Sequence, residues 1–168
     1  MSGNGKTKST KRKPTSYADM TRRQRETFAR PAKRGNRATG TDAAHKQSHE
    51  LQTGFLASKP GPKVQNRAEI KKTATMTSSS QNLRMKSAKG NRSTDRLNDA
   101  AILQAQRTGD RLNPAAAKRA VQAYKGGSVD PSVAGKDGAW TTSAIGEMRA
   151  NTGKPGQPPK VKNLARQK

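Results

Sequence analysis

The feature that most limits what this chain can fold into is its shortage of large apolar side chains. Only 17 of its 168 residues are Leu, Ile, Val or Phe. Highly charged chains in which these residues fall below about 20% tend to be disordered. Each residue that becomes ordered loses about 1–2 kcal/mol of backbone entropy, which burial must offset. The composition therefore predicts a mostly irregular, extended chain with a few short α-helices and no conventional globular core.

The second constraint is charge, because 35 Lys and Arg residues stand against 11 Asp and Glu, for a net charge of +24. The excess is +10 in residues 1–40, +7 in 41–92, +3 in 93–125 and +4 in 126–168. Such a chain repels itself and is typical of proteins that bind a polyanion or an acidic protein surface. Nucleic acid is the commonest polyanion, so we expect it as a partner.

The basic residues gather in seven clusters whose long side chains suit phosphate oxygens, Arg by paired hydrogen bonds. Contacts to phosphate position a protein without reading base sequence, and five aromatic residues are too few for a base-stacking surface. We therefore expect binding without sequence specificity. The predicted phosphate contacts are Lys11, Arg12, Lys13, Arg22, Arg23, Arg25, Lys33, Arg34, Arg37, Lys71, Lys72, Arg84, Lys86, Lys89, Arg92, Arg107, Arg111, Lys160, Lys162, Arg166 and Lys168.

The phrase DRLN occurs twice, at residues 95–98 and 110–113, and each copy is interpreted as the start of a helix. In the second copy Asn113 is a good N-cap and Pro114 takes the first helical position. In the first copy Asn98 can cap in the same way, although Ser93 could instead cap a longer helix beginning near Asp95. The repeat predicts two helices, at about 99–108 and 114–125.

These two helices, joined by a turn through Gly109, would form a small helical hairpin near residues 95–125. It lies in the least charged stretch of the chain, so we expect it to be the ordered anchor. About 34 residues are too few for most domains to fold alone, so the hairpin is expected to dock on a partner.

Changes of composition divide the chain into four segments. We expect a basic N-terminal tail with one helix at about 16–30, then a helix from about Thr41 followed by a polar linker. Two helical turns are expected at 66–76, extended chain at 77–94, and one short helix at 142–150 in a turn-rich C-terminal strap. The predicted segments are residues 1–40, 41–92, 93–126 and 127–168.

The sparse apolar residues of these helices are expected to dock on partner proteins instead of closing a core. The predicted docking residues are Tyr17, Met20, Phe28, Leu51, Phe55, Leu97, Ile102, Leu103, Leu112, Val121, Tyr124 and Trp140.

Several function classes find no support in the sequence. There is no cysteine, no apolar run long enough to span a membrane and no secretory signal pattern. Phosphate-loop, dinucleotide-binding and nucleophile-elbow motifs are missing, and the acids are scattered singly. His45 and His49 stand four residues apart, but no third ligand is evident for a metal. We therefore expect a non-enzymatic protein with no cofactor, no metal and no small-molecule substrate, neither secreted nor bound to a membrane.

Together these features favour a structural component of a large nucleoprotein assembly. In this hypothesis short helices dock on a protein shell and basic straps contact nucleic-acid phosphates, as in a virion, at the phage head interior or near the portal. The first alternative is a ribosomal or other ribonucleoprotein component with extended RNA-binding tails. The second is a disordered segment that wraps an acidic protein and folds on binding.

Overall fold

A computed structural model describes residues 40–59 and 67–150 of the chain. These residues are 76% helical, with five main helices and one small two-stranded sheet in a compact arrangement. The expectation of a mostly irregular and extended chain was therefore wrong. In chain order the elements are β1 (Thr41–His45), α2 (His49–Ser58), α3 (Arg67–Thr77), the short 3-10 helix η1 (Ser80–Asn82), β2 (Leu83–Ser87), α4 (Ala88–Gly90), the π-helical turn η2 (Asn91–Asp95), α5 (Arg96–Thr108), α6 (Pro114–Gly127) and α7 (Pro131–Ala150).

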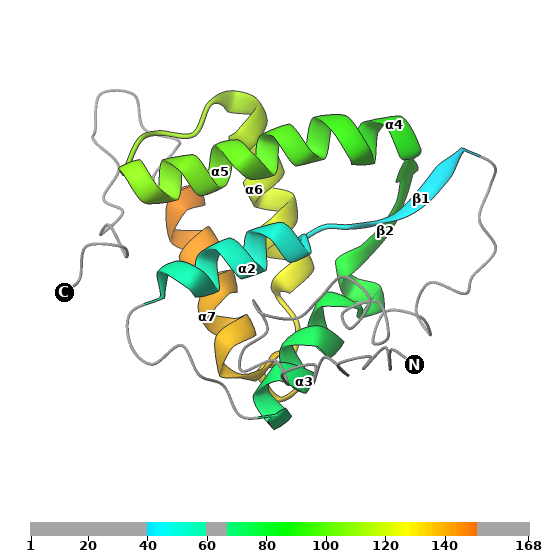
Figure 1. Cartoon of the computed structure of the whole chain (residues 1–168), viewed down its shortest axis with the longest axis vertical. Coiled ribbons are helices and arrows are strands. Elements are labelled where there is room, and N and C mark those ends of the chain that lie inside the picture. The colour runs from blue at the N-terminus through cyan, green and yellow to red at the C-terminus, as the bar shows by residue number, and fades with distance from the viewer. Residues whose placement is uncertain (1–39, 60–66, 151–168) are drawn as a thin grey trace, which may run out of the picture.

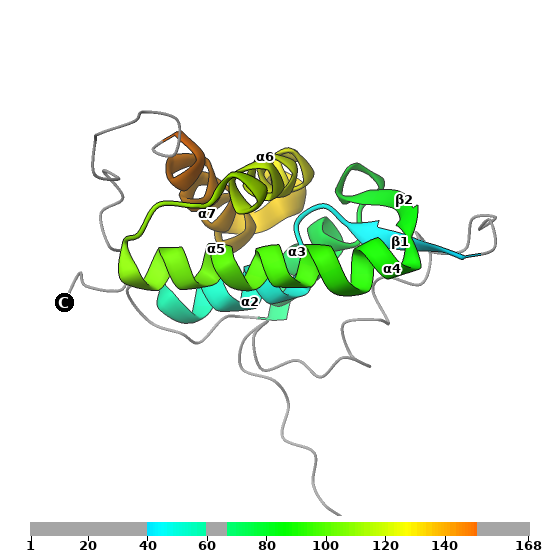
Figure 2. The ribbon, with the colours of Figure 1, turned by 90° about the horizontal axis from the view of Figure 1, so that it is seen from above.

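One long helix runs along one side of the molecule, because α4, η2 and α5 follow one another without a break (Figure 1). Viewed from above, α2 lies beside this helix, while α6 and α7 lie behind it (Figure 2). The pairs α2–α5, α5–α6, α6–α7, α3–α7 and α2–α7 are in contact. The long helix therefore packs against α2 and α6, and α7 packs against both of these.

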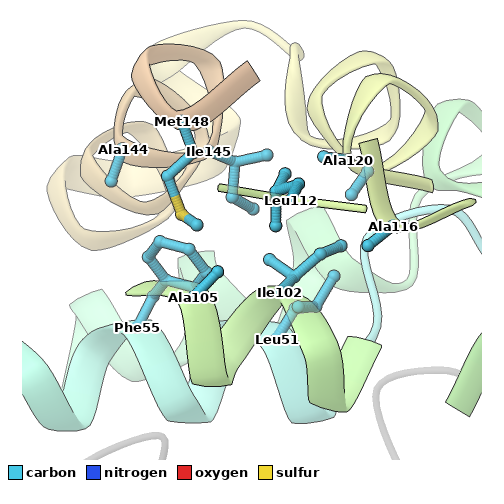
Figure 3. Packing of buried hydrophobic residues seen from close by; sticks show 11 residues of the cluster. Leu51, Phe55, Ile102, Ala105, Leu112, Ala116, Ala120, Ala144, Ile145 and Met148 are labelled. Carbon is cyan, nitrogen blue, oxygen red and sulfur yellow. The ribbon is translucent and has the colours of Figure 1, made fainter. Parts of the chain in front are cut away.

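The core lies between α2, α5, α6 and α7, where their apolar side chains meet (Figure 3). Leu51, Phe55, Ile102 and Ile145 are completely buried there. Helix α6 contributes alanines at i, i+4 and i+7, namely Ala116, Ala120 and Ala123. The expectation of no globular core was wrong because the count of large apolar residues leaves out alanine. Small side chains let helices pack closely, so a few large apolar side chains are enough to fill the core between them.

Buried polar side chains extend this core, and they hydrogen-bond to one another. The Gln47 backbone N–H donates to Asn82 Oδ1 at 2.6 Å, and Asn82 Nδ2 donates to the Gln47 and Thr77 carbonyls at 2.9 and 2.8 Å. Gln52 Nε2 donates to Gln47 Oε1 at 2.9 Å and Thr77 Oγ1 donates to Gln52 Oε1. Because these groups are satisfied, amides take core positions without the large cost of an unpaired buried polar group.

The segment after Gly40 is a strand, so the expected start of a helix near Thr41 was wrong. Thr41–His45 pair antiparallel with Leu83–Ser87, Ala43 lying opposite Met85. Helix α2 begins only after Ser48, whose hydroxyl accepts a hydrogen bond from the Leu51 N–H at 3.1 Å. Ser48 is therefore the N-cap of the helix, and the residues before an N-cap are free to adopt extended backbone.

The two copies of DRLN have different structures. Asn113 caps α6, its Oδ1 accepting from the Ala116 N–H at 2.8 Å, and Gly109 ends α5 with φ of 77°. Asn98 instead lies inside the long helix, so the expected helix start at the first copy was wrong. Pro114 in the second copy forces the preceding residue out of helical geometry, whereas Asp99 at the equivalent place does not. The helix therefore runs on from Ala88, where Ser87 caps it.

The pair of helices around Gly109 is not a separate anchor. Both α5 and α6 contribute to the core shared with α2 and α7. The C-terminal segment was also expected to be mostly turns, yet α7 begins at Pro131 and bends at Gly135, where φ is 69°. Residues 77–94 contain β2 and the start of the long helix instead of extended chain alone. The helix expected at 16–30 lies outside the described residues.

The different roles of the two asparagines give a direct test. Asn113→Ala should lower the free energy of unfolding by about 1 kcal/mol, because the Ala116 N–H loses its cap. Asn98→Ala should leave stability unchanged or raise it slightly, because alanine is the better residue in a helix interior. Urea denaturation of both variants measures the difference. Equal losses at the two positions would contradict the assignment of Asn98 to a helix interior.

Candidate nucleic-acid interface

The long helix from Ala88 to Thr108 separates its charges between two faces. Its acids, Asp95 and Asp99, are buried on the inner side. Lys89, Arg96 and Arg107 are exposed on the outer side. Arg96 and Arg107 are 11 residues apart within α5, about three helical turns, so they lie in line over about 17 Å, and Lys89 precedes the π-helical turn. The outer face of this helix, defined by these three residues, is here called the basic face.

The residues between these cations leave the basic face open to a close approach. Ser93, Ala100 and Gln104 are exposed on it, and none is acidic or bulky. Leu97 beside them has 72% of its surface exposed. A row of cations separated by small or uncharged side chains can contact the phosphates of a backbone, because these intervening side chains do not repel the phosphates.

Asp95 connects the helix to the sheet. Its carboxylate accepts from Lys86 Nζ at 2.6 Å and from Arg84 at 3.0 Å, both on β2. Burial alone would raise the pKa of Asp95. The hydrogen bond from Lys86 and the charges of Arg119, Lys86 and Arg84 outweigh it and hold that pKa below its usual value. Asp95 is therefore ionised at neutral pH, and its negative charge offsets the positive charges of Arg84 and Lys86 on β2.

Asp99 connects the helix to α6 by a buried ion pair. Arg119 Nε donates to Asp99 Oδ1 at 2.7 Å and its NH2 group to Oδ2 at 3.1 Å. The same guanidinium donates to the carbonyl oxygens of Lys46 at 2.6 Å and His45 at 3.4 Å. Arg119 thus joins α5, α6 and the end of β1, and fixes how the long helix is rotated. This rotation turns the acids inward and the basic face outward.

The predicted phosphate contacts have different surroundings in the structure. Lys71, Lys72, Lys89, Arg107 and Arg111 are exposed. Arg84 and Lys86 are half-buried against Asp95, and Arg92 contacts Asp42 at 3.1 Å. The remaining predicted contacts lie outside the described residues: Lys11, Arg12, Lys13, Arg22, Arg23, Arg25, Lys33, Arg34, Arg37, Lys160, Lys162, Arg166 and Lys168.

Most of the predicted docking residues in the described ranges use their apolar surface within this chain. Leu51, Phe55, Ile102 and Leu112 are buried in the core, and Leu103, Tyr124 and Trp140 pack against it. Val121 is half-buried, and Leu97 is exposed. Tyr17, Met20 and Phe28 lie outside the described residues.

Sequence reasoning missed two residues of this region. Arg96 was not among the predicted contacts, although its spacing of 11 residues from Arg107 places both on one face of an α-helix. That signal is visible only if residues 96–108 are assigned to one helix. Arg119 was missed because its role depends on a carboxylate 20 residues away, and no local pattern marks such a pair.

The structure also bears on metal and membrane sites. The rings of His45 and His49 lie 4.7 Å apart between centroids. Within residues 40–59 and 67–150, no group of three or more His, Asp or Glu side chains is placed to hold a metal ion. Nor does any helix in these ranges combine the length and apolar character needed to cross a bilayer.

Comparison of this chain with protein-family models, with curated protein sequences and with solved structures gave no match.

Proposed function

We propose that this protein is a nucleic-acid-binding structural component of a large nucleoprotein assembly. A compact helical domain presents the basic face to the phosphate backbone, and the chain on either side of the domain adds further cations. The observation that carries this proposal is the separation of charge on the long helix. Acids and bases are paired on its inner side, and the charged residues of its basic face are all positive.

The distribution of charge along the chain supports the same function. The described residues hold 17 Lys and Arg and nine Asp and Glu, so most of their charge is balanced within the domain. Residues 1–39 and 151–168 hold another 17 Lys and Arg with only two acids. A polyanion is the partner that neutralises such an excess, and it binds mainly by release of its counterions.

Among nucleoprotein particles we favour a virion, in the head interior or near the portal. The alternative is a ribonucleoprotein. Gradient sedimentation of native lysate, with this chain followed by mass spectrometry, tests the assignment. Migration with DNA-filled particles supports the virion, and migration with ribosomal RNA contradicts it.

The basic face makes a quantitative prediction for DNA binding. The triple variant Lys89→Gln, Arg96→Gln and Arg107→Gln should reduce the slope of log K against log salt concentration by about 2–3, since each lost phosphate contact removes about 0.9. Fluorescence anisotropy with a labelled DNA duplex at several salt concentrations measures the slope for the full chain.

A matched control keeps the same net charge. Lys118, Lys125 and Lys136 are exposed on α6 and α7, away from the basic face. Replacing these three by glutamine should change the slope by clearly less. If the two triple variants behave alike, the basic face has no special role, and a salt slope near zero for the unmodified chain would contradict nucleic-acid binding altogether.

A further inference from the structure

We propose that the cleft beside the π-helical turn binds a single phosphate group of the nucleic acid, with Arg92 and Arg96 as its main donors. This proposal rests on the proposed function and assigns one specific site within it. The cleft has a volume of about 300 Å³ and lies between the start of α2 and the beginning of the long helix. Figures 1 and 2 show these two helices side by side.

The wall on the long helix carries the donors. Asn91, Arg92 and Arg96 all line the cleft. Asn91 and Arg92 belong to the turn η2, and Arg96 is the first residue of α5. A π-helical turn is wider than an α-helical turn and often occurs at functional sites, because it redirects side chains relative to the regular helix. Here the two arginines border the same cleft.

The floor of the cleft contains two carboxylates, but their charge is already compensated. Asp95 accepts from Lys86 and Arg84, and Asp99 accepts from Arg119. Three cations thus contact two anions below the cleft, so the floor carries an excess of one positive charge. The carboxylates therefore hold the site together and do not repel an anion above them.

The donors on the wall differ in how far they are already engaged within the protein. The Arg92 side chain is 74% exposed. It donates from Nε to Asp42 Oδ2 at 3.1 Å and from its NH2 group to Oδ1 at 3.3 Å, and Asn91 Nδ2 donates to the same carboxylate at 3.2 Å. A phosphate therefore competes with Asp42 for these two residues. Arg96 is exposed. A guanidinium group offers parallel N–H donors that match two oxygens of one phosphate, and two such groups can hold one phosphodiester. Ser48, whose hydroxyl caps α2, also lines the cleft, on the α2 side.

Glu50 gives the site an internal check, because it is an exposed acid on the rim of the cleft. Its negative charge opposes an incoming phosphate. Removing this charge should therefore strengthen binding, whereas removing that of Arg96 should weaken it. General electrostatic attraction to a basic protein would also give these two signs. The cleft is therefore identified as a specific site only if removing the charge of a distant basic residue has no effect.

The first experiment titrates inorganic phosphate into the full chain, labelled with ¹⁵N, at constant ionic strength. NMR follows the side-chain Nε–H signals of the arginines and the backbone amide of Asn91. We expect saturable shifts confined to Arg92, Arg96 and their neighbours, with a dissociation constant in the millimolar range. Shifts that are spread over all arginines, or that do not saturate, would overturn the proposal.

Three variants sharpen this test. Arg96→Gln should weaken phosphate binding about tenfold, the loss typical of one charge-assisted contact. Glu50→Gln should strengthen it about two- to threefold. Lys125→Gln, at an exposed position of α6 outside the cleft, should leave it unchanged. Equal weakening by Arg96→Gln and Lys125→Gln would overturn the cleft as a specific site.

A parallel titration with a DNA duplex separates this proposal from the function on which it rests. If DNA binds but the signals of the cleft do not respond to phosphate or DNA, the cleft fails and the nucleic-acid function stands. If inorganic phosphate binds in the cleft but DNA does not bind, the nucleic-acid function fails, and the phosphate group comes from a smaller molecule. Shifts of the same arginine signals with both ligands support both proposals.

Discussion

Arg119→Met is expected to lower the free energy of unfolding by about 3–5 kcal/mol, because it leaves the Asp99 carboxylate buried without its counterion. The side chains of both residues are almost completely buried, and two hydrogen bonds of 2.7 and 3.1 Å join them. The substitution also removes the donor to the Lys46 carbonyl. Urea denaturation followed by the fluorescence of Trp140, the only tryptophan, measures the loss.

Two further variants show whether the uncompensated charge causes this loss. Adding Asp99→Asn to Arg119→Met should restore a large part of the stability, because no buried charge then remains at this position. Arg111→Met, at an exposed site before α6, should change stability by less than about 0.5 kcal/mol. If Arg119→Met were as mild as Arg111→Met, the ion pair would not be buried in solution.

Phe55→Ala should have an effect of similar size, about 3–5 kcal/mol, through loss of burial and the cavity that remains. Phe55 is completely buried in α2, facing α5 and α7 (Figure 3). The same denaturation experiment measures the change, and the slope of the transition shows whether the domain still unfolds in one step.

Leu97→Ala is the control for Phe55→Ala, since Leu97 is a large apolar residue with 72% of its surface exposed. Its replacement should leave stability within about 0.5 kcal/mol of the original. A loss at Leu97 as large as that at Phe55 would mean that the outer face of the long helix is covered in solution, which would contradict the basic face as a free surface.

The local signals of the sequence indicated several helices. A predicted helix start was correct where a residue excluded helical backbone just before it, and wrong where no residue did. The asparagine and proline at 113–114 marked the start of α6 because proline restricts the residue before it. The same phrase at 95–98 contains no such restriction, and the longer helix continued through it. The spacing of Leu51 and Phe55 indicated α2, but the preceding residues paired as a strand with β2, 40 residues away along the chain.

The fold as a whole could not be predicted from the count of large apolar residues. The core also contains alanines, which the count omits. Gln47, Gln52 and Asn82, which count as polar, are buried as well. These amides are buried because each finds a partner from a distant part of the chain, Gln47 and Asn82 with each other and Gln52 with Thr77. Whether a buried amide is satisfied depends on the tertiary structure, so composition alone gave the wrong fold class.

The candidate site shows the same division. The net charge and the clusters of Lys and Arg are sequence properties, and they motivated the expectation of a polyanion. Which cations face outward is a tertiary property, because Arg84 and Lys86 face a buried carboxylate while Lys89 and Arg96 do not. The cleft beside the π-helical turn brings together residues about 45 positions apart, and no local pattern predicts it.

The alanines of α6 have a consequence for how this protein can change over time. Ala116, Ala120 and Ala123 are fully buried in a helix that packs against both α5 and α7. A larger side chain at these positions would push two helices apart, and glycine would cost backbone entropy within the helix. Replacement of these alanines by larger residues and by glycine should therefore both destabilise the fold. The least conspicuous residues of the sequence should be among the slowest to diverge in any lineage that keeps this fold.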